Sequence, residues 1–355
     1  MVQQFYPLRV SQIYKTTDDC AVLTFDVTEE LKDVFKFTQG QYLTLKTKIN
    51  GEDVRRSYSL CSSPLDDEWK VAVKKIEDGR FSTYANQVLK EGDVLEVMPP
   101  NGRFFRKIDE TASKNYVAFA AGSGITPIHS IIKTHLLREP NSTFKLFYLN
   151  RNVQSIILRE EIEGLKNKFL GRLELYYFLT QEERDAPLFN GRFSTEKLET
   201  VAEKLMDVDR VDDFFICGPN DMIFLIKEFL EKKGVEKEKV HFELFNTPGN
   251  TKKKRVLDTN NKESSTVSII LNGIKTTFSM KRDGENILDA ALRNNADLPF
   301  ACKGGVCCTC RAKLVEGEAP MEVNYALEEE EVKNGYILTC QAIPKSDSLL
   351  VDFDS

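Results

Sequence analysis

The stretch that decides the fold of this chain is Cys302-Lys-Gly-Gly-Val-Cys307-Cys308-Thr-Cys310, together with Cys340, which stands 30 residues after Cys310. Three cysteines at C-x4-C-x2-C spacing and a distant fourth are the plant-type arrangement that holds a [2Fe-2S] cluster. Gly304 and Gly305 allow the chain to turn tightly and let backbone N–H groups approach the sulfurs. The pattern therefore predicts four metal ligands: Cys302, Cys307, Cys310 and Cys340.

A structural zinc site is the alternative use of four cysteines. Zinc usually takes paired C-x2-C knuckles or adds histidine, and all three histidines of this chain lie far upstream. We therefore favour the iron-sulfur cluster. Cys308 lies between two ligands and is expected to point away from the cluster as a spare thiol, while Cys20 and Cys61 are expected to be ordinary core or surface residues.

The cysteines lie in a C-terminal domain, which we place at residues 265–355. It opens with two strands, Thr266–Leu271 and Ile274–Met280, joined by Asn272-Gly273, and an Asn-Gly pair between alternating strands is the strongest short-range hairpin signal. Before it, residues 248–264 are polar and basic without usable periodicity, as expected for an exposed linker.

Residues 1–110 read as short alternating strands with turn residues between them, and this spacing suggests a small antiparallel β-barrel. The expected strands are Leu8–Tyr14, Ala21–Asp26, Gln41–Thr47, Val54–Leu60, Trp69–Lys75 and Val94–Met98, with one short helix near Phe81–Leu89.

In residues 111–247 apolar strands alternate with helical stretches, which indicates a parallel α/β domain. The expected strands are Tyr116–Ala121, Phe144–Leu149, Leu173–Thr180, Phe214–Cys217 and His241–Leu244, with a helix at Asp221–Lys232.

The composition is that of a globular chain of two or three domains: 355 residues, 41% hydrophobic and 29% charged. The N-terminus lacks a basic region followed by an apolar core, and no stretch approaches the roughly 18 apolar residues of a membrane span. We therefore expect a cytoplasmic protein without membrane contact. Its eight cysteines would stay reduced there, so metal or redox chemistry explains them before disulfides.

Negative charge is concentrated near the C-terminus. From Ser264 onward there are 9 basic and 14 acidic residues, a net charge of −5 out of −6 for the whole chain. Such a field argues against nucleic-acid binding and suits docking to a basic patch on a protein partner. The acidic stretch Glu328–Glu331 and the cluster loop are the expected docking face.

Arg56-Ser57-Tyr58-Ser59 ends a barrel strand and supplies three groups that a flavin nucleotide needs. The arginine suits a pyrophosphate, the tyrosine presents an aromatic face to an isoalloxazine ring, and Ser59 offers a hydroxyl. An ordinary strand with a cross-strand Arg and Tyr is the alternative. About 20 residues later a glycine turn with hydroxyl side chains opens a helix and makes an anion site. The residues expected there are Val73, Lys74, Gly79, Phe81, Ser82 and Thr83.

Gly122-Ser-Gly124-Ile-Thr126-Pro127 follows an apolar strand and opens a helix, which is the context of a phosphate-binding turn. Pro127 stands where the dinucleotide fingerprint has its third glycine. After the next strand Arg151 favours NADPH, since an NAD enzyme more often carries an acid there, and Ser155 is expected to assist. A solvated arginine at a strand end is the alternative reading.

Cys217-Gly218-Pro219 ends a later strand of the same domain, at the edge where open parallel sheets bind ligands. A buried cysteine more often serves packing alone. The Gly-Pro pair and the helix that begins there favour a role in binding.

With R-x-Y-S, GSGITP, CGP and the ferredoxin cysteines in this order, the chain resembles the ferredoxin–NADP reductase superfamily in its fused form, reductase first and ferredoxin last. The resemblance implies an FAD barrel, an NADP domain and a β-grasp ferredoxin domain of α+β class. It places the Ser59 hydroxyl close to flavin N5 and the Cys217 thiol near nicotinamide C4, and it puts Glu243 and Phe245 beside the flavin ring. Ser59, Cys217 and Glu243 are thus the expected catalytic residues.

Within that superfamily, Cys302–Lys313, Asn324–Leu327 and Gly335–Gln341 resemble the reductase subunits of phenylacetyl-CoA epoxidases. The implied activity moves hydride from NADPH to FAD and single electrons to the [2Fe-2S] cluster. The implied acceptor is a separate oxygenase complex, for which a diiron phenylacetyl-CoA epoxidase is expected. A reductase of another ring-hydroxylating oxygenase or of a desaturase is the alternative, and a non-catalytic redox sensor is a third reading.

Overall fold

The structure is a computed structural model that describes residues 4–245 and 263–355. The chain divides into two compact units. The first is Tyr6–Phe245, and the second comprises the remaining residues, of which 4–5 and 263–355 are described. Most of the expected linker, 248–264, lies outside the described residues.

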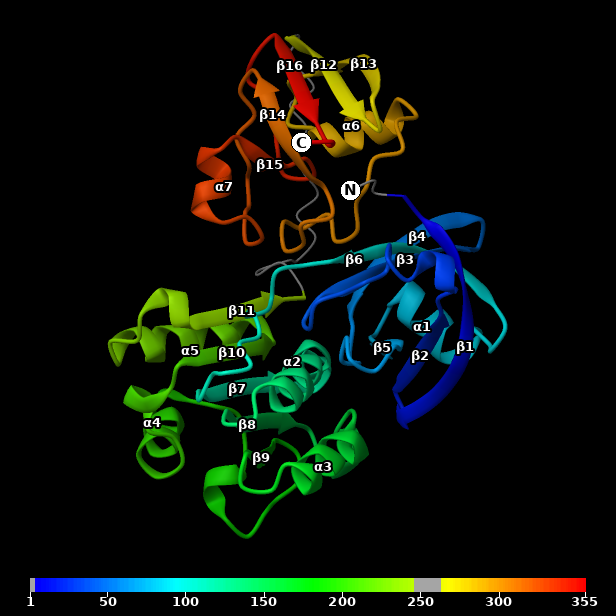
Figure 1. Ribbon diagram of the computed structural model, residues 1–355. Helices are drawn as coiled ribbons and strands as arrows, with labels where there is room; N and C mark the ends of the chain where they lie inside the picture. The colour runs from blue at the N-terminus through cyan, green and yellow to red at the C-terminus, as the bar shows by residue number, and fades with distance from the viewer. Residues whose placement is uncertain (1–3, 246–262) are drawn as a thin grey trace. The chain divides into compact units, whose positions relative to one another are not determined.

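The first half of the N-terminal unit is a six-stranded antiparallel barrel (Figure 1). Its strand order is β4-β3-β6-β1-β2-β5, and the bridge between Leu60 and Val71 brings the end of β4 to β5, so the sheet closes on itself. The strands are β1 (Tyr6–Thr17), β2 (Cys20–Asp26), β3 (Tyr42–Ile49), β4 (Glu52–Ser59), β5 (Trp69–Lys74) and β6 (Val94–Asn101), with η1 (Glu29–Leu31) and α1 (Arg80–Gln87). The antiparallel barrel expected from the alternating pattern is confirmed.

The second half is a five-stranded parallel sheet of order β11-β10-β7-β8-β9. Its strands are β7 (Asn115–Ala121), β8 (Thr143–Asn150), β9 (Leu173–Leu179), β10 (Asp213–Gly218) and β11 (Val240–Leu244). The helices are α2 (Ile125–Arg138), α3 (Arg159–Lys168), α4 (Thr195–Lys204) and α5 (Asn220–Lys232), with short turns η2 (Gly122–Gly124), η3 (Val153–Ser155), η4 (Pro187–Phe189), η5 (Val208–Arg210) and η6 (Lys237–Lys239).

Helices cover both faces of this sheet, which explains why its central strands are almost wholly apolar. Helices α2 and α3 lie on the barrel side and α4 and α5 on the other (Figure 1). The chain leaves β7 toward β8 and later returns to the opposite side at β10. The carboxyl ends of β7 and β10 therefore form the topological switch point at which such sheets bind ligands.

Buried hydrogen bonds hold the barrel against α2. The Ser130 hydroxyl donates to the Ser62 carbonyl at 2.6 Å, His129 Nδ1 lies 2.6 Å from the Cys61 carbonyl oxygen, and the Thr134 and Ser63 hydroxyls are 2.8 Å apart. Cys20 and Cys61 are buried in the same region, as expected of core residues. Because these contacts exclude water, they fix the barrel rigidly against the sheet.

The C-terminal unit is a mixed five-stranded sheet of order β13-β12-β16-β14-β15 with two helices. Its elements are β12 (Ser264–Leu271), β13 (Ile274–Lys281), α6 (Ile287–Arg293), β14 (Arg311–Glu316), α7 (Glu329–Lys333), β15 (Tyr336–Leu338) and β16 (Ser348–Asp352). Asn272 (φ 55°) and Gly273 (φ 73°) form the expected hairpin turn. The expected α+β domain is confirmed, whereas β14 to β16 and both helices were not located from the sequence. None of the helices in the described ranges could reach across a membrane as an apolar segment.

Candidate functional site

Strand β4 places Arg56 and Tyr58 on one face, because residues two apart in a strand point the same way. The Arg56 side chain is exposed, and its Nη1 donates to the Arg55 carbonyl at 2.7 Å. The Tyr58 ring is partly buried, with its centroid 5.4 Å from that of Phe81. Burial raises the pKa of Tyr58, so its phenol stays protonated. The strand thus offers a cation beside a flat, neutral aromatic wall.

Helix α1 starts directly beside this wall. The Ser82 hydroxyl accepts from the Ile76 N–H at 3.3 Å and donates to the Gly79 carbonyl at 3.1 Å, and the Phe81 ring is 1% exposed. The Thr83 N–H is bonded to the Gly79 carbonyl. The Ser82 hydroxyl and the Phe81 ring therefore serve the local fold. What this helix start offers an anion is mainly its backbone N–H groups.

Strand β5 brings a second cation to the junction of barrel and sheet. Val73 is fully buried, while the Lys74 Nζ lies 3.7 Å from Asp19 Oδ2 and would be 3.8 Å from a Cβ atom placed on Gly122. Gly122 opens the GSGITP turn with φ 52°, a left-handed conformation that favours glycine. The Tyr148 hydroxyl donates to its carbonyl at 3.0 Å. A lysine of the barrel thus reaches the turn expected to bind phosphate.

The GSGITP turn packs without a gap against the CGP segment. A Cβ atom on Gly124 would lie 2.1 Å from the Cys217 carbonyl oxygen. Thr126 and Pro127 are buried in the first turn of α2, and the Thr126 hydroxyl donates to the Ser123 carbonyl at 3.0 Å. Gly124 is therefore required for close approach, and the Thr126 and Pro127 side chains serve the turn itself.

The barrel and the sheet meet at Ser59, whose hydroxyl donates to Glu243 Oε2 at 3.1 Å. Glu243 lies on β11 directly beside Cys217 of β10 in the parallel register. In sequence Ser59 is 158 positions from Cys217 and 184 from Glu243. The structure thus brings together Ser59, Cys217 and Glu243, which were expected to act together.

Both ionisable members of this cluster are neutral near pH 7. Burial raises the pKa of Glu243 to about 8, although the hydrogen bond from Ser59 lowers it. Burial and then the nearby Glu243 charge raise the pKa of the Cys217 thiol well above its usual value. The carboxyl group can therefore hold a proton beside the expected position of the nicotinamide and flavin rings.

The residues after Cys217 shape the same edge. A Cβ atom on Gly218 would lie 2.7 Å from Met222 Cε and 3.0 Å from Ala121 Cβ. Pro219 is the N-cap of α5 with an extended backbone, and Phe245 packs half-buried against the core of the unit. Gly218 is therefore constrained by packing, and Pro219 directs the chain into α5.

Arg151 follows β8 in a compact turn. Its side chain is exposed and forms no hydrogen bond or ion pair with any residue that the structure describes. Its N–H donates to the Ser155 hydroxyl at 3.2 Å, and the Ser155 N–H donates to Asn152 Oδ1 at 3.0 Å. Ser155 thus stabilises the turn that carries Arg151.

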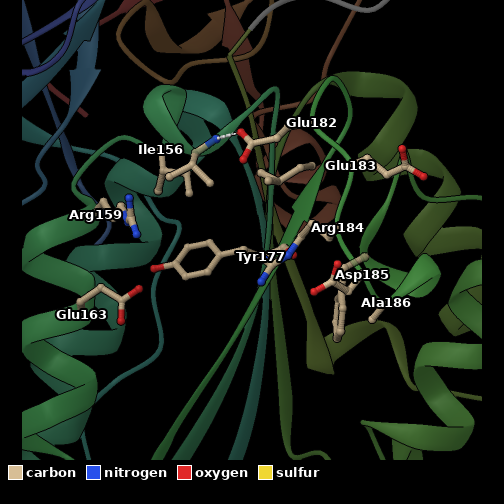
Figure 2. A pocket seen from close by; sticks show the side chains of 12 residues that line it. Ile156, Arg159, Glu163, Tyr177, Glu182, Glu183, Arg184, Asp185 and Ala186 are labelled. Carbon is tan, nitrogen blue, oxygen red and sulfur yellow. Dashed lines mark hydrogen bonds between the residues drawn. The ribbon is translucent and has the colours of Figure 1, made fainter.

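A cavity of about 550 Å³ borders this turn. Figure 2 shows the Tyr177 side chain directed between Arg159 and Glu163 of α3, with Glu182 and Glu183 on the opposite wall. Its charged lining contains four carboxylates and two arginines: Glu163, Glu182, Glu183, Asp185, Arg159 and Arg184. This cavity was not expected from the sequence.

In the C-terminal unit the four expected ligands form two thiol pairs. Cys307 Sγ lies 3.1 Å from Cys302 Sγ, and Cys310 and Cys340 are within hydrogen-bond reach of each other. Among the described residues no three His, Cys, Asp or Glu side chains are grouped closely enough for a single metal ion. A pair of thiolates for each of two irons is the donor set of a [2Fe-2S] cluster.

The cluster loop directs backbone N–H groups at the sulfurs. The Gly304 N–H donates to Cys302 Sγ at 3.3 Å, and the Gly305 N–H contributes a hydrogen bond to Cys340. Gly305 has φ 75°, and a Cβ atom there would lie 2.9 Å from the Val323 carbonyl oxygen. The two glycines therefore do what the sequence predicted, since they permit the turn and bring N–H groups to the thiolates.

Cys308 points away from the two pairs. Its Sγ lies 3.2 Å from the Ala326 carbonyl oxygen, and the side chain is 8% exposed in the core of the unit. This agrees with the expectation of a thiol outside the ligand set.

Family models match three consecutive parts of the chain. An oxidoreductase FAD-binding domain matches residues 7–105, an oxidoreductase NAD-binding domain matches 119–228, and a 2Fe-2S iron-sulfur cluster binding domain matches 269–345. Their order is the order of the barrel, the parallel sheet and the C-terminal unit.

Curated relatives match over nearly the full length. The chain is 43% identical to a 1,2-phenylacetyl-CoA epoxidase subunit of Escherichia coli over 351 residues, covering 99% of this chain and 98% of the relative. It belongs to the ferredoxin–NADP reductase-like family. This reductase is also 32% identical, over 98% of its length and 96% of the relative, to the 3-ketosteroid-9-alpha-monooxygenase ferredoxin reductase component of Rhodococcus rhodochrous.

A solved structure shares the fold. Phthalate dioxygenase reductase superposes with a TM-score of 0.61 at 23% identity, covering 98% of both chains. The reductase is thus an NAD(P)H-dependent oxidoreductase with FAD-binding, nicotinamide-binding and 2Fe-2S domains.

The residues present fit each of these groups. The exposed Arg56, the Tyr58 ring and the start of α1 suit FAD. At the end of β8 the Asn150 side chain is 6% exposed, and neither of its polar atoms has a hydrogen-bond partner among the described residues. Such an orphaned amide at a ligand-binding edge suits a coenzyme. The thiol pairs suit the cluster.

Two residues near the coenzyme turn were not expected from the sequence. Glu182 follows β9, and its Oε2 accepts from the Val153 N–H at 2.8 Å. The rule that parallel sheets bind ligands at the carboxyl ends of their strands could have identified it. Tyr148, which bonds the Gly122 carbonyl, lies inside an apolar strand, where no sequence signal separates it from packing.

Replacing Gly124 by alanine should disrupt the junction of the two turns. The new Cβ would meet the Cys217 carbonyl oxygen at 2.1 Å, so β10 or α2 must shift. We expect a loss of about 2 kcal/mol in the free energy of unfolding and a higher KM for the coenzyme. Gly164→Ala is the matched control, because that helical glycine has open space around it and should gain roughly 0.5–1 kcal/mol. Equal effects in urea unfolding would contradict the packing argument.

Coenzyme-driven dye reduction should decline as the pH rises through about 8. Because its pKa is raised to about 8, Glu243 is protonated at pH 7 and ionises near pH 8. An ionised Glu243 then opposes the negative charge that hydride brings. In a pH profile of kcat/KM, this decline should be absent from Glu243→Gln. It should remain in Glu238→Gln, which alters an exposed acid. If the decline above pH 8 persisted unchanged in Glu243→Gln, it would have to come from the ionisation of another group.

Proposed function

We propose that this reductase takes hydride from NADPH onto FAD and passes single electrons through a [2Fe-2S] cluster to a separate oxygenase complex. The contact that carries the proposal is Ser59 with Glu243 beside Cys217, which joins the FAD-binding barrel to the nicotinamide-binding sheet at the switch point. Bound FAD accepts an electron pair and releases electrons singly, which a nicotinamide cannot do. The paired thiols of the C-terminal unit support a one-electron acceptor.

The individual roles follow from position and chemistry. Ser59, Cys217 and Glu243 position the reacting rings, with Phe245 alongside. FAD is held by the side chains of Arg56, Tyr58 and Lys74 and by the backbone around Val73 and the helix start, which comprises Gly79, Phe81, Ser82 and Thr83. The coenzyme is bound at the carboxyl edge of the sheet, with Arg151 as the contacting side chain and with turns shaped by the other residues: Gly122, Gly124, Thr126, Pro127, Ser155, Gly218 and Pro219. The cluster ligands are Cys302, Cys307, Cys310 and Cys340.

The proposed domain limits are 1–110 for the FAD domain, 111–247 for the nicotinamide domain, 248–264 for the linker and 265–355 for the ferredoxin domain. The three family matches lie within these limits. A cytoplasmic location is proposed too, supported by eight cysteines, all within the described residues, none of which forms a disulfide there.

NADPH is the proposed coenzyme because Arg151 is exposed at the end of β8 with its guanidinium uncommitted among the described residues. A guanidinium fork suits a phosphate dianion, whereas the ribose hydroxyls of NADH are better served by an acid.

The proposed partner is the diiron oxygenase of a phenylacetyl-CoA epoxidase. The support is the 43% identity to the Escherichia coli protein of that name over 99% of this chain. A reductase for another oxygenase is the second candidate, favoured by 32% identity to the Rhodococcus rhodochrous component over 98% of the chain. A redox sensor that lacks catalysis has less support, because it has no need of the coenzyme site.

Acidic side chains lie next to the cluster loop and suit a basic partner. The Tyr325 N–H bonds the Gly305 carbonyl at 3.0 Å, so the segment before α7 lies against the loop. Glu329 of α7 is 97% exposed, whereas Glu331 is tied to Arg311 at 2.9 Å. We propose this surface as the docking face for the oxygenase.

Anaerobic titration tests the electron path and the coenzyme preference together. NADPH should bleach the flavin and then produce the electron paramagnetic resonance signal of a reduced cluster, with NADH much weaker. Arg151→Ala should raise the KM for NADPH by about tenfold or more, the scale of a lost charge-assisted contact, and leave NADH little changed. Flavin bleaching without a cluster signal would contradict the proposed path. Equal use of both coenzymes would contradict the preference.

Reversing two exposed charges tests the docking face. Glu329→Lys with Glu330→Lys should lower oxygenase-coupled turnover by about tenfold at low salt, because like charges slow association, and should leave NADPH-driven dye reduction intact. The control pair is Glu316→Lys with Glu318→Lys at the far end of β14. Similar losses in both pairs, or a loss of dye reduction, would refute this face.

A further inference from the structure

The turn that carries Arg151 is stabilised mainly from within. The Ser155 hydroxyl accepts from the N–H groups of Arg151 and Asn152 at 3.2 and 3.1 Å, and it donates to the Asn152 carbonyl at 2.8 Å. The Asn152 side chain accepts from the Ser155 N–H. These bonds shape the turn, but all of them join residues that move with it.

Two hydrogen bonds tie the turn to the rest of the sheet, in addition to the packing of the Val153 side chain against the core. The parallel pairing continues past the ends of β8 and β9, since the Gln181 N–H donates to the Arg151 carbonyl at 2.7 Å. The next residue, Glu182, accepts from the Val153 N–H at 2.8 Å through its side-chain Oε2 (Figure 2). Glu182 therefore holds the part of the turn that the ladder does not reach.

This anchoring matters because no side-chain contact within the described part of the chain fixes the position of Arg151. Its guanidinium has no partner among the described residues, so the direction in which it points depends on the backbone of the turn. A long side chain loses rotamer entropy when it binds an anion. If the turn is held in place, the side chain starts from a narrower range of directions, and the entropy cost of binding is lower.

We propose that Glu182 is a positioning residue for coenzyme specificity: it holds the turn that presents Arg151 to the 2′-phosphate of NADPH. This inference rests on the proposed NADPH preference. It gives a role to a residue that does not itself touch the coenzyme's reacting atoms.

Glu182 also has an effect that opposes NADPH binding, because its negative charge repels the same phosphate. Glu182, Glu183 and Asp185 are all exposed at this edge, so water and salt weaken their repulsion of a bound phosphate. Such repulsion changes affinity by about twofold. The hydrogen bond from the Val153 N–H to Glu182 is exposed as well, and a charge-assisted bond of this kind is worth up to about tenfold. Positioning should therefore outweigh repulsion.

Steady-state reduction of a dye by the FAD-loaded, full-length enzyme tests the inference with NADPH and NADH in turn. Glu182→Ala should raise the KM for NADPH by about tenfold with kcat unchanged and should change the KM for NADH less than about twofold. Glu182→Gln keeps a carbonyl acceptor for the Val153 N–H and should retain the wild-type NADPH KM. The matched control is Glu183→Ala, which removes the neighbouring charge and should have almost no effect.

A double variant separates this inference from the function on which it rests. If Glu182 acts through Arg151, Glu182→Ala should add nothing in an Arg151→Ala background. If Arg151→Ala lost the preference for NADPH but Glu182→Ala kept it, the role of Glu182 would be overturned while the phosphate contact of Arg151 would stand. So would equal effects of Glu182→Ala and Glu182→Gln, or a lower NADPH KM in either. If Arg151→Ala kept the wild-type preference, the proposed phosphate contact would fail and the role of Glu182 with it.

Discussion

The buried hydrogen bonds between α2 and the segment that follows β4 are the contact on which the N-terminal unit depends. The Ser130 hydroxyl and the His129 ring bind the carbonyl groups of Ser62 and Cys61, away from water. Polar groups that are buried in this way have no alternative partner, so sliding the barrel along α2 would leave each of them unpaired. The barrel is therefore fixed in one position on the sheet.

The chemistry of the unit follows from that fixed position. Ser59 ends a barrel strand and Glu243 lies near the end of the sheet's edge strand, and they meet only because the two parts are held in register. The same junction brings Lys74 of the barrel to the GSGITP turn. Hydride transfer requires two rings in near contact, so a rigid junction is a physical requirement of a two-domain reductase.

The C-terminal unit solves a different problem, which is to hold four thiols close together. Like-charged thiolates repel, and backbone N–H groups directed at the sulfurs offset that repulsion. The glycines of the loop permit this arrangement. A Cβ atom added to Gly305 would lie only 2.9 Å from the Val323 carbonyl oxygen. The loop and the segment before α7 are thus packed as one surface beside the thiol pairs.

Much of this could be predicted from the sequence, because the deciding signals are local. The strand and helix patterns located all expected elements of the N-terminal unit to within three residues, and cysteine spacing alone pointed to the four thiols that the fold gathers into two pairs. Alternation, turn residues and ligand spacing are properties of neighbours in the chain, so they can be read directly. The elements after the cluster loop could not, because β15 has three residues and α7 has five, too short for a periodic signal.

What only the tertiary structure decided is which distant residues meet. The pairing of Ser59 with Glu243, the approach of Gly124 to Cys217 and the bond from Val153 to Glu182 join residues separated by 184, 93 and 29 positions. It also decided which expected side chains serve the fold, as the hydroxyls of Ser82 and Thr126 do. The sequence by itself determined the kinds of groups and their local turns, because these depend on adjacent residues. Contacts between elements depend on how whole layers pack, and no local pattern encodes that.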